Sequence, residues 1–168
     1  TDAIADSIVN TLPGGRWMDE HLVITGGEPL LGWQRAYPDL LSHEKMRGLK
    51  EMTFETNGTQ HISEEFGKYM YTWQKNRAID SITFSVSPKL SISGEKWEEA
   101  ICPDVVARYK QYGFVYLKFV VASKEDVEEA EQAVDAYRKR GFTGPVYLMP
   151  CGGVESLYSL NARNVAVE

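Results

Sequence analysis

Near its N-terminus the chain contains the stretch Val23-Ile24-Thr25-Gly26-Gly27-Glu28-Pro29. Its first residues are apolar or β-branched, which favours a short strand that ends at the glycine pair. Two adjacent glycines let the backbone approach a ligand without interference from Cβ, so their N–H and C=O groups could bind an ammonium or a carboxylate. Glu28 adds a negative charge that suits an ammonium group, and Pro29 stiffens the exit. The alternative interpretation of Gly-Gly alone is a plain turn between a strand and a helix.

Four more short runs of β-branched or aromatic residues follow, each bounded by turn-forming residues. With the first, the predicted strands span residues 22–25, 52–56, 81–86, 115–121 and 145–149. The intervals between them are long enough for helices, and strands separated by helices are typical of parallel βα units. The sequence therefore predicts one α/β domain over residues 1–168, either a doubly wound sheet or part of a barrel.

Helical patterns fill the intervals. They cover residues 3–10, 33–46 with an interruption at Pro38, 64–74, 103–112 and 123–140, and the segment 160–168 also has a helical pattern. The segment Ser63-Glu64-Glu65 could cap the third of these helices. Ser123 or Asp126 is a candidate cap for the helix over 123–140, in which acids crowd the first turn and basic residues the last.

The less common residues gather where predicted strands end, which is where α/β folds bind ligands. Glu55-Thr56-Asn57-Gly58 follows the second strand; because a helix comes next, we expect no hairpin and an available Asn57 amide. Ser87-Pro88-Lys89 follows the third strand, and Lys89 is a compact cation suited to a carboxylate, although a lone lysine is more often a solvated loop residue. Lys118 could equally lay its stem over apolar surface. Met149-Pro150-Cys151-Gly152 follows the fifth strand.

The composition narrows the classes of partner that the chain is expected to bind. The net charge of −6 argues against a nucleic-acid-binding surface, and a small-molecule partner fits better. The two cysteines, Cys102 and Cys151, form no C-x-x-C pair, so no disulfide or zinc spacing exists, and the three histidines do not cluster. Because these cysteines form no disulfide framework, we expect a protein of the reducing cytoplasm. No apolar run approaches the roughly 18 residues of a membrane span, and the sequence shows no secretory signal pattern. Because the first residue is Thr1 and the last residues have a helical pattern, we expect the chain to be incomplete at both ends.

Taken together, the strand-end motifs resemble a known superfamily. Thr25-Gly26-Gly27-Glu28-Pro29 and Glu55-Thr56-Asn57-Gly58 are similar to motifs of radical S-adenosylmethionine enzymes. Ser87-Pro88-Lys89 and Leu148-Met149-Pro150-x-Gly-Gly narrow the resemblance to the 7-carboxy-7-deazaguanine synthases, from about Leu22 to the end of the chain. The resemblance implies a partial parallel (β/α) barrel and a carbon–nitrogen lyase that converts 6-carboxy-5,6,7,8-tetrahydropterin to 7-carboxy-7-deazaguanine in 7-deazapurine (queuosine-type) biosynthesis.

The resemblance also implies roles for individual residues. Thr25 would contact the pterin substrate. The S-adenosylmethionine site would be lined by Gly26, Gly27, Glu28, Asn57, Ser87, Pro88, Lys89, Lys118, Met149, Pro150, Cys151 and Gly152. Cys151 is assigned no chemistry of its own, since a free cysteine in a protein interior usually behaves as a small apolar residue.

One defining feature of the superfamily is absent. Its members hold a 4Fe-4S cluster on a C-x-x-x-C-x-x-C loop, and this sequence has no such cysteine spacing. We expect the cluster ligands and those for Mg2+ in a missing N-terminal segment, so that this chain holds no metal and is inactive alone. The resemblance further implies a homodimer and an electron donor such as flavodoxin. The open alternatives are a glycyl-radical-enzyme activase-like protein and a non-catalytic binding homologue without a cluster.

Overall fold

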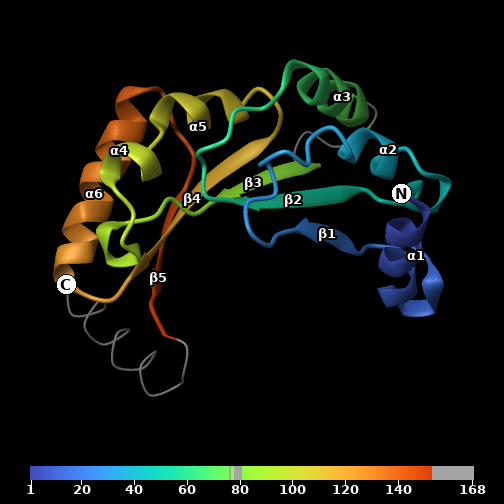
Figure 1. The fold of residues 1–168 in the computed structure, drawn as a ribbon, viewed down its shortest axis with the longest axis horizontal. Helices are drawn as coiled ribbons and strands as arrows, with labels where there is room; N and C mark the ends of the chain where they lie inside the picture. The colour runs from blue at the N-terminus through green and yellow to red at the C-terminus, as the bar shows by residue number, and fades with distance from the viewer. Residues whose placement is uncertain (76, 78–80, 153–168) are drawn as a thin grey trace.

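The computed structural model describes residues 1–75, 77 and 81–152. Five parallel strands form one sheet in the order β1-β2-β3-β4-β5 (Figure 1). All five strands expected from the sequence are confirmed, with bounds displaced by one residue at most ends. The strands are β1 (His21–Ile24), β2 (Glu51–Thr56), β3 (Ile82–Val86), β4 (Phe114–Val121) and β5 (Val146–Pro150). The helix expected over 160–168 lies outside the described residues.

The helices agree with the sequence except between β1 and β2 and after β3. The α-helices are α1 (Asp2–Thr11), α2 (Tyr37–Leu41), α3 (Glu64–Gln74), α4 (Trp97–Ala100), α5 (Pro103–Tyr109) and α6 (Lys124–Lys139), and the 3-10 helices are η1 (Pro13–Gly15), η2 (Glu44–Met46) and η3 (Ser91–Ser93). The helix predicted over 33–46 is wrong, because Pro38 lies in the first turn of the short α2 instead of interrupting a longer helix. The four-residue α4 was not predicted.

Both predicted N-caps are confirmed. Ser63 Oγ accepts a hydrogen bond from the Phe66 backbone N–H at 3.3 Å at the start of α3. At the start of α6, Ser123 Oγ accepts from Asp126 N at 3.2 Å while Asp126 Oδ2 accepts from Ser123 N at 3.0 Å. This reciprocal pair is a capping box, and it satisfies backbone donors that the first helical turn leaves without partners.

The sheet is singly wound. Each strand pairs with the next one in the sequence, and because βα crossovers are right-handed, consecutive crossovers return on the same side. The order never reverses, as it would in a doubly wound sheet. Figure 1 shows α3, α5 and α6 together on one side. The core lies under them and centres on stacked rings: the Phe54 and Phe84 centroids are 5.7 Å apart, and those of Phe84 and Tyr109 are 4.7 Å apart.

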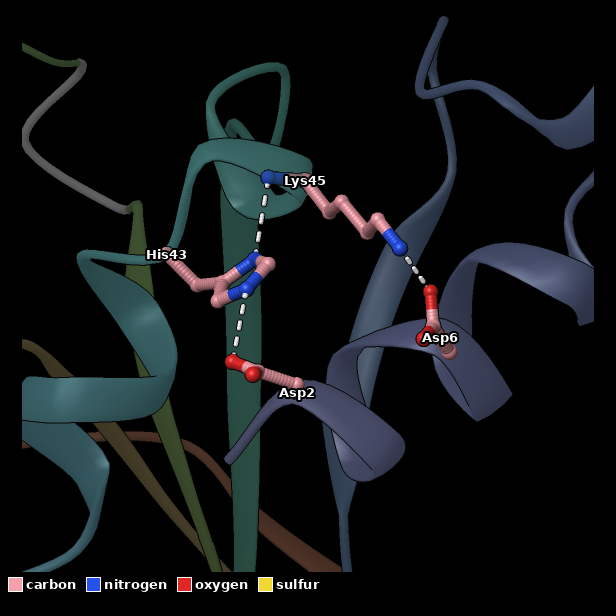
Figure 2. A network of polar contacts seen from close by, with 4 residues as sticks. All are labelled: Asp2, Asp6, His43 and Lys45. Carbon is pink, nitrogen blue, oxygen red and sulfur yellow. Dashed lines mark hydrogen bonds and ion pairs between the residues drawn. The ribbon is translucent and has the colours of Figure 1, made fainter.

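Two polar contacts attach α1 to the segment before β2 (Figure 2). Asp2 Oδ1 lies 3.3 Å from His43 Nε2, and Asp6 contacts the ammonium of Lys45. His43 Nδ1 also accepts from the Lys45 backbone N–H at 3.2 Å and so caps η2. The neutral His43 ring therefore carries its proton on Nε2, where it can donate to Asp2.

The other face of the sheet is open over much of its area. Parallel sheets are normally covered on both faces, yet large apolar side chains on this face are exposed. Val23 on β1 and Tyr147 on β5 are 51% and 54% exposed. Because side chains alternate along a strand, this face also carries Glu55, Ser85 and Lys118 of the three central strands.

Candidate functional site

A cavity of about 420 Å³ lies at the carboxyl ends of the strands, where the open face meets the loops. All five strands or the loops after them contribute to its wall. The lining residues are Thr25, Gly27, Glu28, Glu55, Thr56, Asn57, Ser85, Ser87, Lys89, Glu95, Lys118, Val120 and Met149. Residues from segments far apart in the sequence thus meet in one place, at the edge where such folds bind ligands.

The cavity brings together most residues that the motifs singled out. Eight of them line it: Thr25, Gly27, Glu28, Asn57, Ser87, Lys89, Lys118 and Met149. Gly26 lines a neighbouring apolar cavity between α1 and β1, and Pro88 is buried beneath its loop. Pro150, Cys151 and Gly152 do not contribute to the wall. Alternation along β5 turns Met149, and not Pro150, toward the open face. At Cys151 the chain is still bonded to β4, because its backbone N–H donates to Val121 O at 2.7 Å.

Five lining residues were missed: Glu55, Thr56, Ser85, Glu95 and Val120. Alternation along the strands contains the signal for two of them. Glu55 precedes Asn57 by two residues and Ser85 precedes Ser87 by two, so each faces the same side as the singled-out residue.

The two glycines after β1 have left-handed backbone conformations. Their φ angles are 90° at Gly26 and 49° at Gly27, a region that disfavours a side chain. A Cβ built on either residue would meet no heavy atom within 4 Å. The glycines therefore turn the backbone after β1 while leaving open space beside it.

Glu28 is engaged by the protein itself. Its Oε1 accepts from Thr56 Oγ1 at 2.6 Å and from the Leu30 N–H at 3.1 Å, while Oε2 accepts from the Asn57 N–H at 2.7 Å. The carboxylate thus links the end of β1 to the end of β2. Its negative charge, together with burial as the larger cause, raises the pKa of Tyr37 to about 12. Glu28 still lines the cavity, so the expectation that its charge also meets a ligand ammonium stays a prediction.

The loop after β2 is fixed by close contacts. The Asn57 side-chain oxygen accepts from the Thr59 N–H at 3.0 Å and from Thr59 Oγ1 at 2.8 Å, which is the turn chemistry of an Asx motif. Gly58 has a φ of 81°, and a Cβ there would lie 2.6 Å from Val86 Cγ1. The chain turns here toward α3, and β2 pairs with β3 in parallel, so the expected absence of an Asn-Gly hairpin is confirmed.

A second set of polar groups lies deeper in the cavity. Thr25 Oγ1 donates to Glu55 Oε2 at 3.3 Å, and Lys118 Nζ lies 3.5 Å from Glu55 Oε1. Lys118 therefore directs its ammonium to the cavity and does not simply extend over apolar surface. Next to Glu55 in the sheet, Ser85 is fully buried, and its hydroxyl has no hydrogen-bond partner among the described residues.

Within residues 1–75, 77 and 81–152, no group of three His, Cys, Asp or Glu side chains is close enough to hold a metal ion. Cys102 and Cys151 are free thiols. The same residues contain no helix that is long and apolar enough to cross a membrane.

Comparison with known proteins finds one similar curated relative. The chain is 37% identical over 132 residues to a protein of Pyrobaculum aerophilum named 7-carboxy-7-deazaguanine synthase. The aligned part covers 77% of this chain and 49% of the relative, so the chain spans about half of the relative's length. No protein-family model matches the chain. No solved structure matches it either.

Proposed function

Because the chain is homologous to about half of a 7-carboxy-7-deazaguanine synthase, we propose that it forms the part of such an enzyme that holds S-adenosylmethionine and the pterin. The reaction converts 6-carboxy-5,6,7,8-tetrahydropterin to 7-carboxy-7-deazaguanine. The observation that carries the proposal is the cavity at the carboxyl ends of the strands. Eight residues to which the family resemblance assigns a ligand line it.

We further propose that the sheet is part of a parallel (β/α) barrel. A singly wound sheet with helices on one face is the arrangement of a barrel wall, whose other face points to the interior. The exposed apolar side chains of β1 and β5 are consistent with a wall that continues beyond the described strands.

S-adenosylmethionine fits the residues of the cavity. The open space beside Gly26 and Gly27 lets backbone groups approach the methionine end, and Lys89 supplies a positive charge for its carboxylate. Ser87 is held in place by its own N–H, which donates to Thr56 O at 2.8 Å. Met149 adds an apolar wall from β5. When bound, the cofactor would supply hydrogen-atom abstraction from the substrate, and these residues would bind and orient it.

The described residues do not fit a 4Fe-4S cluster or Mg2+. A cluster needs cysteine thiolates at close spacing, whereas Cys102 lies before α5 and Cys151 follows β5, and no three candidate ligands approach each other. Ligands for both groups, a homodimer and an electron donor such as flavodoxin therefore belong to the whole protein that we propose.

Titration of the chain with S-adenosylmethionine in a calorimeter tests the cofactor site. We expect binding that Lys89→Met weakens and that Lys96→Met, which removes an exposed lysine outside the cavity, leaves unchanged. Absence of binding by the unaltered chain would contradict the proposal. The reaction is tested on the full-length gene product, reconstituted anaerobically with iron and sulfide, by chromatographic detection of 7-carboxy-7-deazaguanine.

The non-catalytic alternative is a homologue that binds the same ligands without a cluster. It is favoured by the absence of a cysteine triad among the described residues. A full-length gene product that binds S-adenosylmethionine but incorporates no iron would support this alternative and exclude the catalytic function. The glycyl-radical-activase alternative gains no support from the relative found.

A further inference from the structure

The cavity contains a polar pair that the cofactor site does not use. Ser85 is fully buried in the wall, and its hydroxyl has no partner among the described residues. Buried hydroxyls nearly always make a hydrogen bond, because an unmet one loses the interaction it had with water. An unpaired hydroxyl that lines a cavity therefore points to a ligand that completes it.

Glu55 lies beside Ser85 and has spare acceptor capacity. The two residues are partners in the register of β2 and β3, so their side chains leave the same face from strands about 4.8 Å apart. A carboxylate accepts up to about four hydrogen bonds, and Glu55 has two long contacts, with Thr25 at 3.3 Å and Lys118 at 3.5 Å. Its side chain is 41% exposed, so the carboxylate is open to the cavity.

Lys118 reaches Glu55 across a strand. It comes from β4 and Glu55 from β2, so the ion pair passes over β3, the strand that carries Ser85. The ammonium keeps a positive charge beside the carboxylate. An anionic acceptor and a buried neutral hydroxyl thus lie on neighbouring strands of the cavity wall.

We infer that Glu55 and Ser85 bind the pyrimidinone edge of the pterin substrate, an inference that rests on the proposed function. That edge presents a 2-amino group and N3–H, which match a carboxylate in two parallel N–H···O bonds. The adjacent O4 is a carbonyl oxygen that the Ser85 hydroxyl can reach as donor. Glu55 is then the residue that selects a 2-amino-4-oxo ring, and Ser85 positions it.

Two observations separate this edge from the cofactor end. Of the three carboxylates that line the cavity, Glu28 already accepts three hydrogen bonds within the protein, Glu95 lies in the loop between η3 and α4, and Glu55 lies beside Ser85. Thr25, which the family resemblance assigns to the substrate, donates to Glu55 and not to Glu28. Glu55 therefore belongs to the substrate end of the cavity.

The test uses three stable probes: S-adenosylmethionine, 6-carboxypterin and 6-carboxylumazine, in which an oxo group replaces the 2-amino group. Calorimetry compares the unaltered chain with Glu55→Gln, Ser85→Ala and the control Glu51→Gln. Glu51 lies on the same strand and face, outside the cavity, where it pairs with His21 at 3.2 Å. Circular dichroism and thermal unfolding establish that each variant is folded.

We expect the unaltered chain and Glu51→Gln to bind 6-carboxypterin at least about tenfold more tightly than 6-carboxylumazine, because the oxo group leaves the carboxylate facing an acceptor. Glu55→Gln should abolish this preference, and Ser85→Ala should weaken both heterocycles, with S-adenosylmethionine binding unchanged in each.

The outcomes distinguish the inference from the proposed function. If the unaltered chain binds neither S-adenosylmethionine nor 6-carboxypterin, the proposed function fails. If it binds both and Glu55→Gln keeps the preference for the 2-amino ring, the inference alone is overturned. Loss of S-adenosylmethionine binding in folded Glu55→Gln would assign Glu55 to the cofactor end and would also overturn it.

Discussion

The role of Glu28 as a clamp between β1 and β2 leads to a quantitative prediction for Glu28→Gln. Glutamine keeps one oxygen, which can still accept from Thr56 or Leu30, but it places an NH2 group against the Asn57 N–H. The charge-assisted hydrogen bond from the Asn57 N–H is lost, and two N–H donors then face each other. The bonds from Thr56 and Leu30 lose their charged acceptor and become neutral hydrogen bonds. Hydrogen bonds to charged groups contribute about 1.5–3 kcal/mol each, so we expect a loss of about 3 kcal/mol in the free energy of unfolding.

Urea unfolding followed by tryptophan fluorescence measures this loss, since the chain contains four tryptophans. With a denaturant dependence of about 2 kcal/mol per molar, the unfolding midpoint should fall by about 1.5 M. The matched control is Glu98→Gln on the exposed side of α4, for which we expect a change within about 0.5 kcal/mol. Equal midpoints for the two variants would refute the clamp. If Glu28→Gln instead keeps its stability and loses S-adenosylmethionine binding, Glu28 contacts the cofactor directly.

Three further predictions address other parts of the molecule. Gly58→Ala should lower the free energy of unfolding by about 3 kcal/mol, since it combines a left-handed backbone with overlap in the core. Gly94→Ala, with a similar φ of 82° and open space around it, should lose only about 1 kcal/mol; equal losses would exclude the overlap. Tyr37 should ionise near pH 12 in the folded chain instead of pH 10. Its contribution to stability is therefore complete below pH 10 and is lost as the pH rises to 12. Absorbance titration compared with Tyr37→Phe measures this ionisation, and a value near pH 10 would contradict the effects of burial and of the Glu28 charge. Asp6→Asn, which removes the exposed pair with Lys45 in Figure 2, should change stability by less than about 0.5 kcal/mol in urea unfolding; a loss above 1 kcal/mol would show that this pair is needed to hold α1.

Local patterns in the sequence predicted the strands and the long helices because those elements depend on alternation, breakers and caps. Ser63 and Ser123 cap their helices as expected. The sequence left the choice between a doubly wound sheet and a barrel wall open, because both consist of the same βα units and differ only in the order of strands. A four-residue helix such as α4 carries little signal of its own. The division of residues 33–46 depends on tertiary packing, because Tyr37 of α2 packs against Phe54 of β2.

The position of the candidate site could also be predicted from local patterns. The singled-out residues lie at or near the ends of predicted strands, and eight of them line one cavity. The direction of a carboxylate is a tertiary property, so the sequence did not show that Glu28 bonds to the neighbouring strand end. For the same reason it did not show that Glu55, in the same motif as Asn57, enters the cavity.

The engagement of Glu28 changes what the glycine motif can contribute to binding. A free carboxylate beside Gly26 and Gly27 would attract any ammonium and would also leave the loop after β1 unanchored. With Glu28 bonded to Thr56 and to the Asn57 N–H, the loops after β1 and β2 are held together. The glycines can then offer backbone groups from a fixed position, which lowers the entropic cost of binding. Under the proposed function, negative charge for the substrate then comes from another strand, and Glu55 on β2 has acceptor capacity to spare.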